Sequence, residues 1–189
     1  MFLMEEDIAL ALAALKKGDI ILYPTDAVWG IGADATNPVA VEKIYALKKR
    51  IDTKAMIVLV PEEKWILDYV AEPAPKVADY IKGITKPTTV IYEHAKNLAS
   101  NLIATDGSIA IRICKANFAQ QLMQAFGKPI VSTSANISGL PTPKCFSDIS
   151  LDIIEGVDYV VRSEQDDTTL KEPSAIVKWE QDQIIIIRS

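Results

Sequence analysis

Hydroxyl and amide side chains are concentrated in a short stretch that follows an apolar segment near residue 130. Residues 132–138 contain four hydroxyls and the amide of Asn136. Short donors of this kind can bind phosphate or carboxylate oxygens without adding bulk, but an elaborate turn would use the same residue types. The Gly-x-x-x-x-Gly-Lys-Ser/Thr pattern of a P-loop occurs nowhere in the chain. The stretch therefore predicts either an anion site of another kind or a structural turn.

A run of positive charge between residues 43 and 54 is a second candidate for anion binding. It contains five basic residues and one acid, a local net charge of plus four in a chain whose net charge is −5. Such a cluster attracts anions, but the last turn of a helix also favours cations because of its dipole. Both interpretations remain open from the residues alone. The basic residues are Lys43, Lys48, Lys49, Arg50 and Lys54, and the acid is Asp52.

A third unusual segment follows the first apolar run and reads Tyr-Pro-Thr-Asp-Ala-Val-Trp-Gly-Ile-Gly-Ala-Asp from Tyr23 to Asp34. Two glycines separated by one residue, Gly30 and Gly32, permit a positive φ or a close approach to the backbone. The third glycine of a dinucleotide fingerprint is absent, so this is weak evidence for nucleotide binding through a Rossmann motif. A tight turn after a strand explains the segment equally well.

The single histidine and the two cysteines do not form a metal-binding or nucleophilic pattern. Cys114 and Cys145 lack the paired spacing of a zinc site or a disulfide framework, so we expect buried free thiols. A lone His94 cannot build a multi-histidine site, and we expect it at the surface or at the end of a strand. No protein-bound metal is expected.

Helical and strand patterns alternate along the whole chain, which favours an α/β fold. The last strands follow one another too closely for crossover helices, so the sheet is expected to be mixed. Residues 1–189 are expected to form one domain, with the acidic segment 163–169 as a mobile surface loop. We expect helices at 5–17, 38–50 with Asn37 as N-cap, 62–70, 76–82, 118–126 closed by Gly127, and 147–155 capped by Ser147. Strands are expected at 19–23, 56–60, 88–92, 109–113, 130–132, 159–161, 175–179 and 184–187.

Composition excludes several classes of protein. With 49% apolar and 24% charged residues in 189, the chain is typical of a globular domain and not of a disordered or repetitive one. A pI near 5.0 argues against a protein that coats nucleic acid through its overall field, although a local basic patch is compatible with it. No apolar run approaches the roughly 20 residues that a membrane span needs. The acidic beginning argues against a secretory signal, and we expect the cytosol.

Five motifs in a fixed order resemble the YrdC-like family, which comprises the L-threonylcarbamoyl-AMP synthases and their relatives. The resemblance extends from about residue 5 to residue 188 and matches the short, single-domain type. It implies a twisted mixed sheet with flanking helices and a concave active-site groove. The motifs are Tyr-Pro-Thr-Asp-x-x-x-Gly-x-Gly at 23–32, Lys-x-Arg at 48–50, Ala-Ile-Arg at 110–112, Ser-Thr-Ser-Ala-Asn-x-Ser-Gly at 132–139 and Pro-Ser at 173–174.

The resemblance implies an ATP-dependent condensation of L-threonine with bicarbonate that yields threonylcarbamoyl-adenylate and pyrophosphate. A tRNA threonylcarbamoyl-transferase complex would then use the product, and contact with tRNA itself is possible. Mg²⁺ would be bound through the phosphates of ATP. By position, Lys48 and Arg50 resemble catalytic triphosphate clamps, which bind the nucleotide together with Ser108, Ser134, Asn136 and Arg188. The residues that resemble the threonine pocket are Thr25, Arg112, Ser132 and Ser174.

An alternative of another class is a non-catalytic or differently specific homologue that acts as a tRNA-binding module. The acidic pI and the lack of aromatic residues among the basic cluster give little support for extended RNA contact. Asp26 lies inside the first motif, and the sequence assigns it no role.

Overall fold

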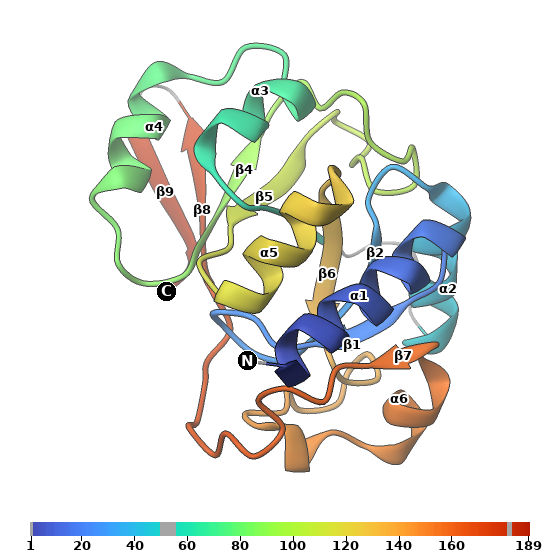
Figure 1. Ribbon diagram of the computed structural model, residues 1–189. Helices are drawn as coiled ribbons and strands as arrows, with labels where there is room; N and C mark the ends of the chain where they lie inside the picture. Colours follow the sequence, from blue (N-terminus) through green and yellow to red (C-terminus); the bar gives the residue numbers. More distant parts are fainter. Residues whose placement is uncertain (1, 50–55, 181–182) are drawn as a thin grey trace.

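A single mixed sheet forms the centre of the molecule (Figure 1). The computed structural model describes residues 2–49, 56–180 and 183–189. Their nine strands are β1 (Ile21–Tyr23), β2 (Gly30–Asp34), β3 (Ile57–Val60), β4 (Thr88–Tyr92), β5 (Ile109–Ile113), β6 (Ile130–Ser134), β7 (Tyr159–Val160), β8 (Ala175–Glu180) and β9 (Gln183–Arg188).

The strand order is β7-β1-β2-β6-β3-β5-β4-β8-β9. The β1/β7, β3/β5 and β4/β8 pairs are parallel, and the other pairs are antiparallel. This confirms the mixed sheet expected from the short connections near the end of the chain. The one-domain organisation stays a prediction.

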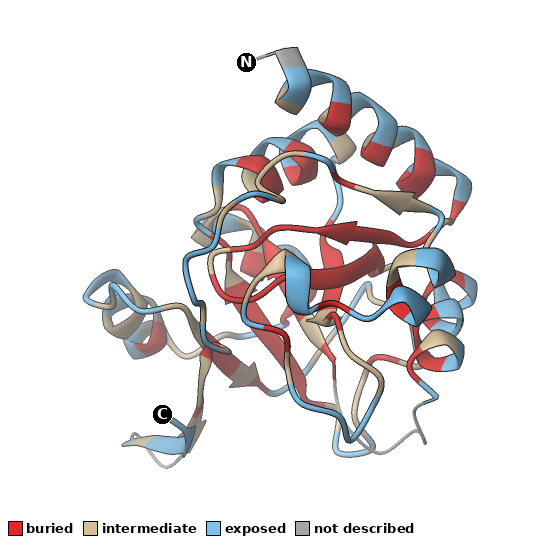
Figure 2. Ribbon diagram, turned by 90° about the horizontal axis from the view of Figure 1, so that it is seen from below, coloured by how far each residue is buried: buried red, intermediate tan, exposed pale blue. Residues whose placement is uncertain are grey.

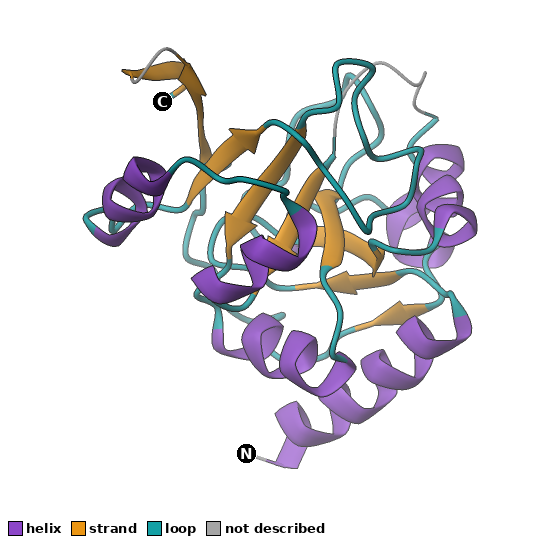
Figure 3. Ribbon diagram, turned by 90° about the horizontal axis from the view of Figure 1, so that it is seen from above, coloured by secondary structure: helices purple, strands orange, loops and turns teal. Residues whose placement is uncertain are grey.

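Helices surround the sheet, and two of the longest, α1 (Phe2–Lys17) and α5 (Asn117–Phe126), lie side by side against one of its faces (Figures 1 and 3). Buried residues are concentrated in the central strands, while the outer sides of the helices are exposed (Figure 2). The other helices are α2 (Pro38–Leu47), α3 (Ile66–Tyr69), α4 (Pro75–Lys82) and α6 (Leu151–Gly156), with short 3₁₀ turns at Glu63–Trp65 and Phe146–Asp148. No helix among the described residues is long and apolar enough to cross a membrane.

Local signals placed two helix ends correctly. The side chain of Asn37 accepts hydrogen bonds from the amides of Val39 and Ala40, at 3.0 and 3.3 Å, and so caps the first turn of α2. Gly127 ends α5 in the left-handed conformation, with φ of 72°, which glycine adopts without steric cost.

Four expectations about secondary structure were wrong. Gly30 and Gly32 do not lie in the tight turn after β1 but in the buried strand β2, which pairs with β1 and β6. The helix expected at 62–70 is a 3₁₀ turn followed by the short α3, and α2 ends at Leu47 because Lys49 adopts a left-handed φ of 51°. Ser147 caps no helix, since it lies in a 3₁₀ turn and α6 begins after Ser150.

The glycines of β2 have a steric reason. A Cβ on Gly32 would lie 2.6 Å from Cε1 of Tyr23 and 2.9 Å from Cγ2 of Ile130, so the tyrosine ring occupies the place of a side chain. Glycine is therefore required for close approach and not for a positive φ.

The acidic segment after β7 is tied to the rest of the molecule. Asp7 on α1 is fully buried and accepts hydrogen bonds from Tyr159 Oη at 2.6 Å, Arg162 Nε at 3.0 Å and the Ser163 amide at 2.7 Å. At the far end, the amide of Lys171 donates a hydrogen bond to the carbonyl of Lys144 at 3.1 Å. These contacts fix both ends of the 163–171 segment.

The cysteines and the histidine lie largely where they were expected. Both cysteines are free, Cys114 is buried as predicted, and Cys145 is only half-buried. His94 is exposed in the turn after β4, which confirms its assignment to a strand end.

Candidate active site

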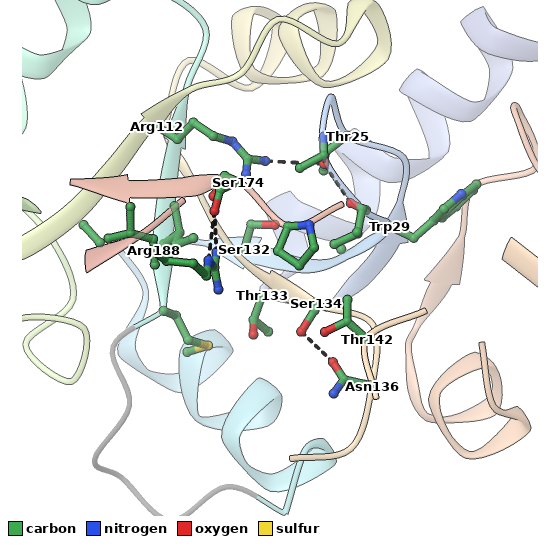
Figure 4. Close-up of a pocket in the computed structure, with 18 of the residues that line it drawn as sticks. Thr25, Trp29, Arg112, Ser132, Thr133, Ser134, Asn136, Thr142, Ser174 and Arg188 are labelled. Atoms are coloured by element: carbon green, nitrogen blue, oxygen red, sulfur yellow. Dashed lines mark hydrogen bonds between the residues drawn. The ribbon is translucent and has the colours of Figure 1, made fainter. Parts of the chain in front are cut away.

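A cavity of about 510 Å³ opens on the sheet and collects most of the predicted site residues (Figure 4). This volume is within the range of small-molecule sites, about 300 to 1,000 Å³. Along strands β3 and β5, alternate residues belong to opposite faces of the sheet, and only one face borders the cavity. Leu59 and Arg112 line the cavity, while their neighbours Val58 and Ile111 are buried on the opposite face. The predicted residues in the lining are Thr25, Lys48, Arg112, Ser132, Ser134, Asn136, Ser174 and Arg188.

Lys48 joins the end of α2 to the turn that follows β6. Its side chain is buried, and Nζ donates hydrogen bonds to the carbonyl oxygens of Ser134 and Asn136 at 2.5 and 2.6 Å. In return, the amide of Ser138 donates to the carbonyl of Lys48 at 3.0 Å. The basic cluster and the hydroxyl-rich stretch therefore meet in space, and the ammonium group is held at the cavity wall.

The turn itself is shaped by Asn136. Its Oδ1 accepts a hydrogen bond from Ser134 Oγ at 2.5 Å, and its Nδ2 donates to the carbonyls of Ile137 and Leu140 at 3.1 and 2.7 Å. The structural turn is therefore confirmed, and Ser134 and Asn136 of this turn also line the cavity, while anion binding by the stretch stays a prediction.

Arg112 brings a second positive charge to the cavity from the end of β5. It is 5% exposed, and its Nη2 lies 3.2 Å from Asp26 Oδ1 and 3.4 Å from Thr25 Oγ1. Its Nε is buried and has no hydrogen-bond partner among the described residues. An unsatisfied guanidinium N–H in a buried position is costly unless a ligand pairs with it.

The hydroxyl of Thr25 already takes part in a tight turn. It donates to the carbonyl of Val28 at 2.7 Å and accepts from the amide of Ala27 at 3.1 Å. Its hydrogen atom is therefore used within the loop, and its oxygen also accepts from Arg112 Nη2.

Ser174 and Arg188 approach the cavity from the other side. Ser174 Oγ lies 2.9 Å from the fully buried Thr89 Oγ1, and the Ser174 carbonyl accepts from Arg188 Nε and Nη2 at 3.0 and 2.7 Å. Partial desolvation and then the charge of Arg112 lower the pKa of Arg188 below its ordinary value. The two guanidinium groups therefore repel each other electrostatically, and an anion bound between them would reduce this repulsion.

Ser132 lines the cavity, and the neighbouring strand β2 has no side chain at Gly30 that would crowd its hydroxyl. A Cβ on Gly30 would be 2.7 Å from Ser132 Oγ, so the glycine leaves the hydroxyl its space. Burial raises the pKa of the neighbouring Tyr23 well above its ordinary value, so the phenol stays neutral.

The sequence did not indicate the apolar wall of the cavity, which is formed by strands β3, β4, β5, β8 and β9. The period-two alternation of a strand would have placed Ala110 beside Arg112, but no sequence signal says which face of β3 or β8 is open. Thr133 and Thr142 also line the cavity and were not singled out. The wall residues are Met56, Ile57, Leu59, Ile91, Ala110, Ile176 and Ile187.

Two predicted site residues are not placed in the cavity. Ser108 precedes β5 and is not among the described lining residues, and its amide instead donates to Asp106 Oδ1 at 2.9 Å. Arg50 lies outside the described residues. Within the described lining there is no Asp or Glu, and the described chain contains no group of three or more His, Cys, Asp or Glu side chains that could hold a metal ion.

Comparison with known proteins gives a consistent family. The family model for Sua5, YciO and YrdC proteins, described as telomere recombination, matches residues 13–189. Threonylcarbamoyl-AMP synthase of Pseudoalteromonas translucida is 36% identical over 160 residues, which cover 83% of this chain and 86% of the relative. The protein of the same name from Photobacterium profundum is 32% identical over 162 residues, 84% of this chain and 88% of the relative.

The fold is also that of a solved structure. P. abyssi Sua5 complexed with L-threonine has a TM-score of 0.85 at 20% identity, and the similar region covers 96% of this chain and 53% of that protein. This chain therefore spans about half the length of that protein. Because the family model covers nearly all of the sequence and the two relatives match most of it, the chain belongs to the Sua5/YciO/YrdC family.

Proposed function

We propose that this chain is a threonylcarbamoyl-AMP synthase, which condenses L-threonine, bicarbonate and ATP to threonylcarbamoyl-adenylate and pyrophosphate. The observation that carries the proposal is that Lys48, the 134–136 turn and Arg112 line one cavity. Two relatives of that name, 32 and 36% identical over most of the chain, support it.

The reaction needs positive charge and positioning more than it needs a proton-transfer residue. The amine of threonine and bicarbonate form a carbamate with loss of water, and a carbamate oxygen then attacks the α-phosphorus of ATP. The bond to pyrophosphate breaks, so negative charge accumulates on the leaving group. Fixed donors and cations that are already in place stabilise that charge at little reorganisation cost.

We assign the phosphates to the side of the cavity with Lys48, Ser134 and Asn136, and we propose that Arg50 of the Lys-x-Arg motif also binds them. The Lys48 ammonium is fixed by two carbonyls, so it acts as a point charge, while Arg50 adds a guanidinium fork suited to phosphate oxygens. Mg²⁺ would be held on the phosphates with its own waters, which suits a lining without carboxylates among the described residues.

We assign threonine to the side with Thr25, Arg112, Ser132 and Ser174. Arg112 would pair with the substrate carboxylate, and the small hydroxyls leave space for a short side chain with its own OH. Arg188, held on the Ser174 carbonyl, would face the nucleotide from the rim, and the apolar wall offers a surface for the adenosine.

The product would be passed to a tRNA threonylcarbamoyl-transferase complex, which acts in the cytosol together with tRNA. A direct contact of this chain with tRNA is the weaker candidate, because the chain carries a net charge of −5.

The decisive experiment is incubation of the pure protein with threonine, labelled bicarbonate and ATP, followed by mass analysis and a pyrophosphate assay. We expect a labelled threonylcarbamoyl-adenylate and equimolar pyrophosphate. Pyrophosphate release that does not depend on threonine would point to another acyl-adenylate, and no adenylate at all would contradict the proposal.

A further inference from the structure

Asp26 is the residue of the first motif to which the proposed reaction gives no role, and the structure places it directly behind the threonine pocket. It does not line the cavity. Its side chain is 13% exposed and forms an ion pair with Arg112, from Asp26 Oδ1 to Arg112 Nη2, at 3.2 Å. Among the described residues, it is the one acid within ion-pair distance of Arg112.

The Asp26 carboxylate also connects two segments that are far apart in the sequence. Oδ2 accepts a hydrogen bond from the backbone amide of Lys115 at 2.8 Å, and Oδ1 accepts from Cys114 Sγ at 3.3 Å. Burial and the Asp26 charge raise the pKa of the Cys114 thiol to about 11, so the cysteine remains a neutral donor. One side chain therefore ties the β1–β2 loop, which carries Thr25, to the end of β5, which carries Arg112.

Arg112 lines the cavity while part of its guanidinium is held in place from behind. Nη2 is held against Asp26 and Thr25, whereas Nε is buried and unpaired among the described residues. A guanidinium group recognises a carboxylate best when its plane is fixed, because less rotational freedom is lost on binding.

We propose that Asp26 is a positioning residue, which orients the Arg112 guanidinium for the carboxylate of the amino-acid substrate. The proposal rests on the assignment of Arg112 to the threonine pocket. For the loss of the Asp26 carboxylate, the positioning role and the charge predict opposite changes in threonine affinity. Removing a negative charge beside Arg112 makes the pocket more positive and would strengthen carboxylate binding, whereas losing the orientation weakens it.

The test measures threonine binding by calorimetry without ATP, and binding of a non-hydrolysable ATP analogue separately. For Asp26→Asn, which keeps an acceptor for the Lys115 amide, we expect threonine affinity to fall about tenfold. Affinity for the ATP analogue should stay within about twofold. Asp26→Glu retains the charge but displaces the carboxylate, and it should also weaken threonine binding. It replaces the asparagine variant if that protein does not fold.

Asp34→Asn is the matched control. Asp34 is also a buried acid with a basic partner, Lys128, at 2.8 Å, but it does not line the cavity or contact Arg112. We expect this variant to have a lower thermal midpoint with threonine affinity within about twofold of the unmodified protein.

A double-mutant cycle shows whether Asp26 acts through Arg112. In an Arg112→Lys background, Asp26→Asn should change threonine affinity by less than about twofold, because the group that it orients is already gone. Losses that multiply, or an Asp26→Asn protein that binds threonine as tightly as the unmodified protein or more tightly, would overturn the positioning role. If the unmodified protein binds no threonine, the proposed function fails, and this inference fails with it.

Discussion

Lys48 Nζ lies 2.5 Å from the carbonyl oxygen of Ser134, a residue 86 positions later in the chain. This contact brings the basic cluster and the hydroxyl-rich stretch together at one cavity wall. The proposed phosphate site depends on it, because neither segment alone distinguishes an anion site from a helix end or a turn.

Lys48→Ala should lower kcat/KM by about 10²- to 10³-fold, because a fixed cation that stabilises charge on the leaving pyrophosphate is lost. The measurement is steady-state pyrophosphate release. Lys49→Ala is the control, since Lys49 is exposed next in the chain and does not line the cavity. Equal rates for the two variants would contradict the assignment of Lys48.

Arg50→Ala should have a similar effect on the rate, with a folded protein by circular dichroism. The reason is the loss of a charge-assisted phosphate contact, which costs about 2 to 4 kcal/mol of transition-state stabilisation. Arg50→Lys should restore part of the activity, because it keeps the charge but not the bidentate fork. If the alanine variant retained the full rate, Arg50 would not be a phosphate clamp.

Arg112→Ala should raise the threonine concentration needed for half-maximal rate far more than the ATP concentration. The guanidinium is the cation of the proposed threonine side, and a lost charged hydrogen bond of this type weakens binding by about ten- to a hundredfold. Lys115→Ala is the comparison, because Lys115 is a nearby exposed cation outside the cavity. A change confined to the ATP dependence would mean that Arg112 belongs to the nucleotide side of the site and not to the threonine side.

Asp7→Asn should reduce stability at neutral pH but not in acid. Burial raises the pKa of Asp7, but the hydrogen bonds from the 159–163 segment outweigh it, and the pKa lies below its ordinary value of 3.8. The native state therefore binds the proton less readily than the unfolded chain does. The contribution to stability is fully present above the unfolded pKa and is lost as the pH falls through the folded pKa.

The size of that contribution is set by the loss of several hydrogen bonds to a buried carboxylate, about 2 to 4 kcal/mol. Urea unfolding at pH 7 and in acid measures it. The two proteins should differ at pH 7, and the difference should shrink as the pH falls below 3.8 and through the lower pKa of the folded state. A difference that persists unchanged in acid would contradict the linkage.

Binding of bulk tRNA should be weaker than about 10⁻⁶ M at physiological salt, because the net charge is −5. A salt titration by fluorescence anisotropy checks this. Tighter binding with a steep salt slope, from a protein that forms no adenylate, would favour the tRNA-binding module instead.

The sequence determined much of the local structure and which residue types could line the cavity. Asn37 caps α2 through its own side chain and Gly127 ends α5 because of its φ, and both are decided within a few residues. The motif residues carry their functional groups wherever the chain places them. The resemblance to the family therefore named eight of the residues that line the cavity before their positions were known.

Tertiary contacts decided the rest. β2 contains two glycines and has little local preference for a strand, but pairing with β1 and β6 and the Tyr23 ring above Gly32 make it one. Alternation along β3 and β5 does not say which face stays open, because that depends on where the helices pack. The role of Asp26 likewise arises from its ion pair with Arg112, 86 positions away, and contacts at such separations exist only once the sheet is assembled.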